Sequence, residues 1–167
     1  MPDRETLERA RKDAREGKSP STQAGEFVKE EMDHIREGKH GARSPQQAIA
    51  IGLSEARRAG VKLPPPKKGT TSEATREKAA RDERKGQSSA KKKTSATRSR
   101  AVRRALKREG KDAASHAALS RQAHRTARQR GSASRKQAAK KAARTKGAEG
   151  RSAAARKAAR TRARRAG

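Results

Sequence analysis

The feature that most limits the fold of this chain is that its charge and its large apolar residues are separated along the sequence. Residues 1–61 hold 12 Lys and Arg against 11 Asp and Glu, whereas residues 62–167 hold 35 against 7. Nearly all of the net charge of +29 therefore lies in the second segment. That segment has no aromatic residue, and its large aliphatic residues are Leu63, Val102, Leu106 and Leu119. Because alanine buries little area and like charges repel, we expect no independent core there.

The first 61 residues are expected to form a small helical head. Ser19-Pro20 and Ser44-Pro45 each place an N-cap residue before a proline at the first helical position, and glycines follow at 17, 38 and 60. This punctuation predicts helices over about 3–16, 20–37 and 45–59, the last two packed antiparallel. Gly52 in mid-helix would be explained by a close crossing of the partner helix. The predicted core residues are Phe27, Val28, Met32, Ile35, Ile49 and Leu53.

A proline-rich linker over 62–69 is the predicted domain boundary, and a basic tail over 70–167 follows it. Glycine and serine divide the tail into short blocks that are competent to form helices: about 70–85, 97–109, 112–130, 134–146 and 151–166. The predicted fold class is therefore all-α, with a helical hairpin or three-helix head and a tail that is largely disordered or becomes helical on binding.

The tail carries basic residues at helical spacing. Arg100, Arg103, Arg104, Lys107 and Arg108 (the 100–108 stripe) fall on one face if the block is helical. Later blocks repeat the pattern more weakly. A merely solvated helix face is the alternative, but residues 111–167 hold 18 basic residues and two acids, which favours a polyanion partner. The predicted nucleic-acid-binding residues are Lys91, Lys92, Lys93, Arg100, Arg103, Arg104, Lys107, Arg108, Arg121, Arg125, Arg128, Lys136, Lys140, Lys141, Arg144, Arg156, Lys157, Arg160, Arg164 and Arg165.

Several classes of function find little support in the sequence. There is no cysteine, and the histidines His34, His40, His116 and His124 show no metal-binding spacing, so no metal or cofactor is expected. The carboxylates are expected on helix surfaces rather than in a pocket, so no enzyme and no catalytic residue is predicted. No apolar run is long enough to span a membrane, and the acidic N-terminus does not resemble a secretory signal.

The segment Gly25-Glu-Phe-Val-Lys-Glu-Glu-Met-Asp-His-Ile-Arg-Glu-Gly-Lys-His-Gly-Ala-Arg-Ser-Pro-Gln-Gln-Ala-Ile-Ala-Ile-Gly-Leu-Ser-Glu-Ala-Arg-Arg-Ala-Gly60 resembles the core of an uncharacterised bacterial family of small basic proteins, known as a domain of unknown function. The resemblance covers about residues 1–63. It implies a bacterial origin and a helical head, and it assigns no activity. Separately, the tail resembles the Ala/Lys/Arg-rich tails of linker histones and bacterial histone-like proteins.

These observations predict a nucleoid-associated, histone-like protein of the cytoplasm that binds double-stranded DNA without sequence preference and compacts or bridges it. The alternatives are an RNA- or ribosome-binding protein, a hydrophilic stress protectant, and a plasmid or chromosome maintenance factor whose head binds a protein partner. The large net positive charge argues against the stress protectant, because such proteins usually have a net charge closer to zero.

Overall fold

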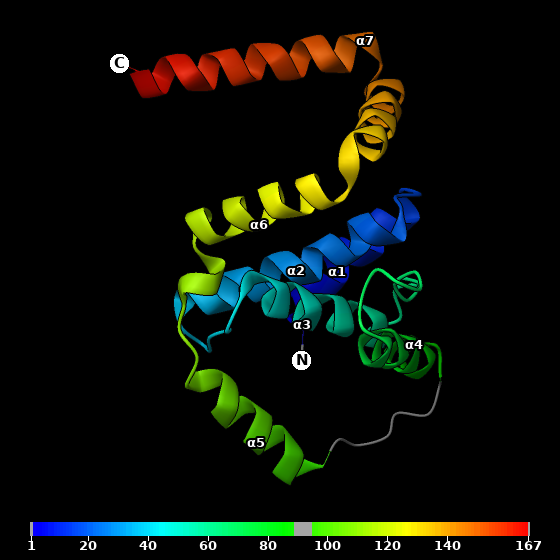
Figure 1. The fold of residues 1–167 in the computed structure, drawn as a ribbon, viewed down its shortest axis with the longest axis vertical. Coiled ribbons are helices and arrows are strands. Elements are labelled where there is room, and N and C mark those ends of the chain that lie inside the picture. Colours follow the sequence, from blue (N-terminus) through cyan, green and yellow to red (C-terminus); the bar gives the residue numbers. More distant parts are fainter. Residues whose placement is uncertain (1, 89–94, 167) are drawn as a thin grey trace. The chain divides into compact units, whose positions relative to one another are not determined.

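The computed structural model describes residues 2–88 and 95–166, and within α7 it leaves the side chains at 145, 146, 148, 151, 154, 165 and 166 out of the description. The described residues are helical or in turns and loops, so the all-α class is confirmed (Figure 1). The chain divides into two compact units, residues 1–122 and 123–167. The helices are α1 (Arg4–Arg15), α2 (Pro20–Glu37), α3 (Pro45–Arg58), α4 (Glu73–Gln87), α5 (Ala96–Lys107), the short 3-10 helix η1 (Asp112–Ala114), α6 (His116–Gln129) and α7 (Gly131–Ala166).

The ends of the first three helices follow the predicted punctuation. Gly17 and Gly38 adopt positive φ angles of 70° and 80°, which glycine tolerates and which end α1 and α2. The Ser44 hydroxyl accepts a hydrogen bond from the backbone N–H of Gln47 at 3.2 Å and caps α3. The Gln47 side chain in turn accepts from the N–H of Arg43, one residue before the position expected of a capping box.

α2 and α3 pack against each other in antiparallel directions. Early α2 residues Ala24 and Phe27 share a core cluster with Ala56 late in α3, whereas late α2 residues Met32 and Ile35 share another with Ala48. The predicted close crossing is present at Gly52, where an added Cβ would lie 2.7 Å from Val28 Cα and 2.9 Å from its backbone nitrogen. The absence of a side chain at position 52 therefore sets the distance between the two helices.

All six predicted core residues lie in or against the two clusters. Phe27, Met32 and Ile35 are buried, and Val28, Ile49 and Leu53 are half-buried against them. The first cluster contains Met32, Ile35, Ala42, Ala48, Ala113 and Ala114, and the second contains Ala10, Ala24, Phe27, Ala56 and Val61. Most of these side chains are alanine, so the core depends on close backbone approach rather than on large side chains.

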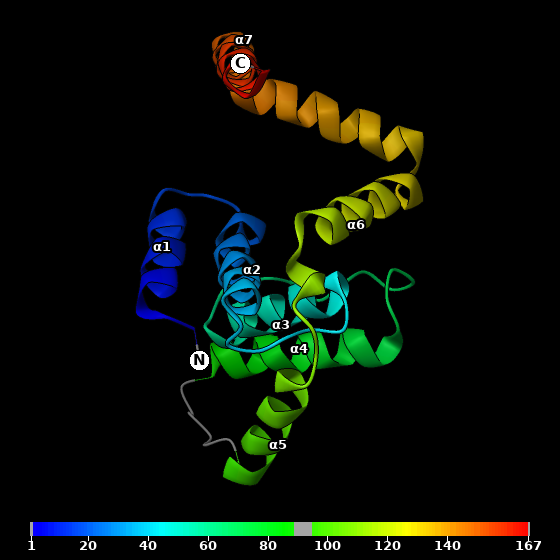
Figure 2. The ribbon, with the colours of Figure 1, turned by 90° about the vertical axis from the view of Figure 1, so that its left-hand side faces the viewer.

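The first unit also draws on residues beyond the 62–69 segment. Ala113 and Ala114 of η1 are buried in the first cluster, and Leu119 of α6 packs on it. Figure 2 shows α4 running along α3, where the Ser54 hydroxyl donates a 2.6 Å hydrogen bond to Asp82. Packing in the first unit thus extends to Gln122; the division into a head over 1–61, a linker over 62–69 and a tail over 70–167 stays a prediction.

The proline-rich segment is held against α3 rather than free. The buried Arg57 guanidinium donates to the carbonyl oxygens of Leu63 at 3.1 Å and Pro64 at 3.3 Å. Leu63 itself packs against the second core cluster. Burial lowers the pKa of Arg57 from its ordinary value, although Asp82 and Glu83 oppose the shift.

The N-terminus of α4 lies a little after the start of the helical block predicted over about 70–85. Ser72 is the N-cap, and its hydroxyl accepts from the N–H of Thr75. Thr70 instead donates to the Lys67 carbonyl in the preceding turn. Both residues are N-cap formers, and the one next to the first helical residue caps the helix.

In the second unit, glycine punctuation again determines the helix breaks. Gly131 has a φ of 70° between α6 and α7. Gly147, with φ 64° and ψ −179°, interrupts α7 where the sequence predicts a gap between two blocks. No described side chain of residues 123–167 is buried. The described side chains of this unit therefore form no core of their own.

Candidate nucleic-acid interface

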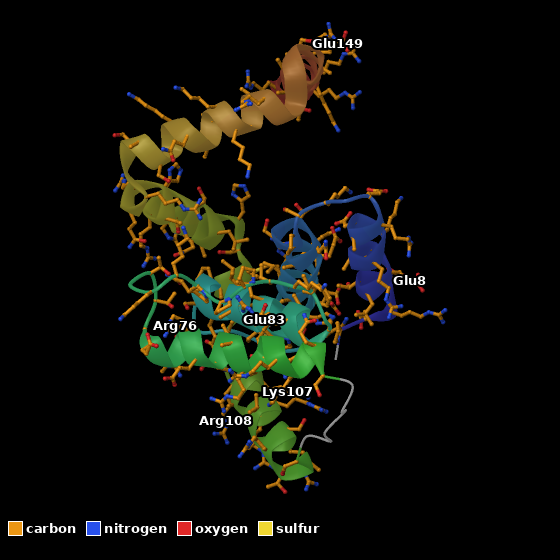
Figure 3. The ribbon with its side chains drawn as sticks, turned by 90° about the vertical axis from the view of Figure 1, so that its right-hand side faces the viewer. Glu8, Arg76, Glu83, Lys107, Arg108 and Glu149 are labelled. Carbon is orange, nitrogen blue, oxygen red and sulfur yellow. The ribbon has the colours of Figure 1, made fainter. Side chains whose placement is uncertain are left out.

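The 100–108 stripe forms one continuous basic surface on α5. Its five side chains line an open groove of about 360 Å³, and all five are exposed. Figure 3 labels two of them, Lys107 and Arg108, at the C-terminal end of the helix. Among the residues that the structure describes, no carboxylate lies within ion-pair distance of these five side chains. The stripe is thus a concentrated positive surface with its hydrogen-bond donors available to a ligand.

Backbone hydrogen bonds attach α5 to the rest of its unit at its C-terminal end. Gly41 N–H donates to the Leu106 carbonyl at 2.9 Å, and Ala42 N–H donates to the Gly110 carbonyl at 3.1 Å. Arg43 adds an ion pair with Glu109 at 3.5 Å. The helix itself buries no residue, and Val102 on the side away from the stripe is 55% exposed. Small or exposed residues on both sides leave the helix accessible to a large partner.

The C-terminal half of α7 carries a second basic surface. Arg156, Lys157, Arg160 and Arg164 (the 156–164 stripe) line an open groove of about 460 Å³ together with Ala153 and Thr161. The structure describes no ion pair for these four basic side chains. Each stripe spans nine residues, or about 12 Å along the helix axis between its first and last residue. The two helices thus present surfaces of similar length and the same charge.

The other predicted residues are distributed over α6 and the first half of α7. Arg121, Arg125 and Arg128 are exposed on α6. The predicted residues in the first half of α7 are also exposed, namely Lys136, Lys140, Lys141 and Arg144. Lys91, Lys92, Lys93 and the Arg165 side chain lie outside the described residues. The predicted set is therefore spread over several helices and does not converge on one pocket.

The basic residues of the first helices have a different environment, because many of them pair with acids. Lys18 contacts Asp13 at 2.6 Å, and Arg9 contacts Glu26 at 2.8 Å. Further pairs are Arg4 with Glu8, Lys12 with Glu16, Arg36 with Asp33 and Lys39 with Glu37. These carboxylates partly neutralise the cations of α1 and α2, so the positive charge without a described ion-pair partner lies mostly on α5, α6 and α7.

The expectation that carboxylates lie on helix surfaces is wrong for part of α2. Glu30 and Glu31 are 6% and 3% exposed, and one oxygen of each has no hydrogen-bond partner in the described structure. Burial raises the pKa of Glu31 to about 7, and the negative charges of Glu55 and Glu30 add to the shift. His34 and His40 lie beside these carboxylates, with ring centroids 6.1 Å apart.

Sequence spacing did not indicate this cluster, because Gly38 reverses the chain between the two histidines. The only sequence signal was the pair of adjacent acids on the helix that also holds the apolar positions Phe27 and Met32. Acidic residues beside apolar positions, such as Glu31 next to Met32, can still be buried when the loop after the helix folds back over its C-terminal end.

Residues 17–68 match a family of unknown function, DUF6496. The match covers α2, α3 and the proline-rich segment, so the expected resemblance of this region to an uncharacterised domain is confirmed. No curated protein and no solved structure matches the chain. Within the described part of the chain, no helix is both long enough and apolar enough to cross a membrane.

Proposed function

We propose that this chain binds double-stranded DNA through its phosphates, without reading base sequence, and acts as a nucleoid-associated, histone-like binding protein rather than an enzyme. The observation that carries the proposal is the pair of exposed basic stripes on α5 and α7, for whose side chains the structure describes no carboxylate partner. A surface of this charge attracts phosphates and releases their counterions on binding.

The chemistry of the stripes suits phosphate contacts. Arginine presents several planar donors to phosphate oxygens, and it predominates in both stripes. Alanine recurs beside these residues, for example at 101, 105, 155 and 159. Such small side chains favour helix and let the helix backbone approach a nucleic-acid backbone.

Nothing in the described surface favours base readout. The chain has no Tyr or Trp, and its single Phe is buried at position 27, so an aromatic stacking platform for unpaired bases is lacking. Contacts to phosphates fix the position of a protein on the duplex but carry no sequence information. We therefore expect unrelated duplexes to bind alike.

The stripes lie on two units, which favours bridging over simple coating. The 100–108 stripe belongs to the first unit and the 156–164 stripe to the second. Two independent phosphate-binding surfaces on one chain can engage two duplexes, or two parts of one duplex, and raise the effective concentration of the second contact.

The test is a series of fluorescence-anisotropy titrations with labelled duplexes of equal length and unrelated sequence, over a range of salt concentrations. If about ten phosphates are neutralised at once, log K should fall by about 9 for each tenfold increase in salt. Affinities for the different duplexes should agree within a few-fold. A shallow slope, or binding to one sequence only, would contradict the proposal. Tighter binding to duplex RNA of the same sequence would favour the RNA-binding alternative.

A further inference from the structure

The C-terminal end of α2 and the residues after it bring two histidines and a carboxylate together. Glu31 and His34 lie on the helix, and His40 lies in the loop that follows. One ligand atom from each of the three lies within 4.8 Å of the others. His40 Nε2 is 3.6 Å from Glu31 Oε2, and the two imidazole rings meet edge to face at 77°. Asp3 and Glu30 border the same group through His34.

The local fold explains why these residues meet. Gly38 takes a left-handed conformation, and the Lys39 N–H donates to the His34 carbonyl at 3.0 Å, so the chain turns back over the end of α2. His40 Nδ1 lies 3.2 Å from the Gly41 carbonyl oxygen. With Nδ1–H donating to this carbonyl, the lone pair of Nε2 is directed toward Glu31. A backbone partner on the second ring nitrogen is the usual way in which proteins orient a metal-binding histidine.

The carboxylates in this place are only partly compensated, because Glu30 Oε1 accepts a hydrogen bond from the Asp3 N–H at 2.6 Å but the other Glu30 oxygen and one Glu31 oxygen have no partner among the described residues. Glu31 is 3% exposed, and its Oε1 has no hydrogen-bond partner among the described residues; the same holds for Glu30 Oε2. In the described structure neither carboxylate pairs with Lys or Arg; their ion-pair partners are histidines, at 3.6 and 3.8 Å. Burying adjacent carboxylates without a cation is costly. A bound cation would remove this cost.

We propose that Glu31, His34 and His40 bind one divalent first-row transition-metal ion, with Zn²⁺ as the best match. Two imidazoles and one carboxylate form a known zinc ligand set, and Mg²⁺ or Ca²⁺ would require oxygen ligands instead. Ligand atoms of a tetrahedral zinc site are about 3.3 Å apart, close to the 3.6 Å between His40 Nε2 and Glu31 Oε2. Water would fill the fourth position, because Glu30 groups with Asp3 and His34 instead of with Glu31 and His40. The site goes beyond DNA binding and does not depend on it.

The consequence is a metal-dependent link between α2 and the C-terminal end of α5. His40 precedes Gly41 and Ala42, whose N–H groups bind the carbonyls of Leu106 and Gly110. An ion held by Glu31, His34 and His40 fixes the 38–42 loop on α2, and this loop anchors the end of the helix that carries the 100–108 stripe. Metal binding should therefore stabilise the first unit.

The test is Zn²⁺ binding by the full chain without an affinity tag and without DNA, measured by competition with a chromophoric chelator. We expect one Zn²⁺ per chain with a sub-micromolar Kd, and a higher Tm when Zn²⁺ is added. Replacing Zn²⁺ by Co²⁺ should give the visible absorption bands of a tetrahedral ion. His34→Ala and His40→Ala should each weaken binding by about 100-fold or more.

Matched variants keep the result interpretable. His116→Ala with His124→Ala removes two exposed histidines of α6 and should leave the Kd unchanged. Glu31→Gln keeps the shape of the side chain; it should remain folded by circular dichroism, bind Zn²⁺ much more weakly and lose the Zn²⁺-dependent rise in Tm. The proposal is overturned if no saturable one-to-one binding is found, if the α6 variant loses the metal, or if folded Glu31→Gln binds Zn²⁺ as tightly as the parent.

Discussion

At the scale of single residues, two helix-interior glycines of the head have opposite surroundings. Gly52 on α3 faces the backbone of α2, and a Cβ there would meet Val28 Cα at 2.7 Å and the Phe27 carbonyl oxygen at 3.0 Å. Gly25 on α2 is exposed and has nothing within 4 Å of its Cβ position. Neither has a positive φ. A difference in unfolding free energy between substitutions at these two positions therefore reflects packing and not backbone conformation.

Gly52→Ala should destabilise the first unit by about 1–3 kcal/mol, because the new methyl group meets backbone atoms that cannot turn away. Gly25→Ala should stabilise it by up to about 1 kcal/mol, since alanine is the better helix former and space is available. Urea unfolding followed by circular dichroism measures both. Equal effects of the two substitutions would mean that α2 and α3 do not cross at Gly52.

The two Ser-Pro helix starts also form a matched pair, because only one of the two serines caps its helix with a side-chain hydrogen bond. The Ser44 hydroxyl accepts from Gln47 N–H and so satisfies one free donor of α3. Ser19 makes no capping hydrogen bond, and among the described residues its hydroxyl contacts the side chains of Ser21 and Thr22. Ser44→Ala should cost about 1 kcal/mol of unfolding free energy, and Ser19→Ala should cost less. A larger loss for Ser19→Ala in thermal or urea unfolding would contradict the capping assignment.

At the scale of elements, α5 combines a basic stripe with contacts at its C-terminal end that attach it to the described part of its unit. Its C-terminal end is held by backbone hydrogen bonds to Gly41 and Ala42, and a Cβ at Gly41 would overlap the carbonyl of Glu109. Because the helix buries no residue, neutralising its stripe should leave the core intact. The stripe can therefore be tested for binding separately from folding.

Replacing Arg100, Arg103, Arg104, Lys107 and Arg108 by Gln should weaken DNA binding and flatten the salt dependence on every duplex alike. Each lost phosphate contact removes about 0.9 from the slope of log K against log salt, so the change should approach 4.5 if all five contacts are made. Anisotropy titrations over a range of salt concentrations give the slope, and circular dichroism checks that the helices remain.

A control with the same loss of net charge separates location from total charge. Its five Lys and Arg to Gln replacements fall on cations that already pair with acids, namely Arg4, Lys12, Lys18, Arg36 and Lys39. This control should change the slope by less than the α5 variant does. If both variants change it equally, the protein acts as a diffuse polycation and the groove on α5 has no special role.

At the scale of the whole molecule, the sequence predicts local structure better than long-range packing. Helix ends can be predicted from residues with a strong local preference, and the structure has a helix start at Ser44, a helix end at Gly38 and an interruption at Gly147. The basic periodicity likewise predicts that Arg100 and Arg104 share a face, and they line one groove. Such features depend on neighbours in sequence, which is why they can be inferred from it.

The rest of the fold depends on contacts that leave no periodic signal. Ala113 and Ala114 are buried beside Ile35 although they lie in a segment dominated by charge, and alanine is equally common on exposed helix faces. The attachment of Gly41 and Ala42 to the end of α5 uses backbone atoms only. His34 and His40 meet because a glycine reverses the chain between them. Each of these contacts requires the three-dimensional path of the chain.

The division into two units makes a final prediction about bridging. Ending the chain after Arg130 keeps α6 whole and removes 13 Lys and Arg together with one Glu. Every residue of both core clusters precedes this point, so the unfolding midpoint should not change. The salt dependence should become shallower because fewer phosphates are neutralised. The shortened chain should also lose the ability to hold two duplexes together, because the 156–164 stripe is gone.

Energy transfer between donor- and acceptor-labelled duplexes measures bridging, and anisotropy at the same salt concentrations measures simple binding. The full chain should raise energy transfer at concentrations where the shortened chain binds each duplex without joining them. A full-length variant with Arg156, Lys157, Arg160 and Arg164 replaced by Gln is the matched control and should behave like the shortened chain. If the shortened chain bridges as well as the parent, the first unit alone supplies both contacts, and the 156–164 stripe has no part in joining duplexes.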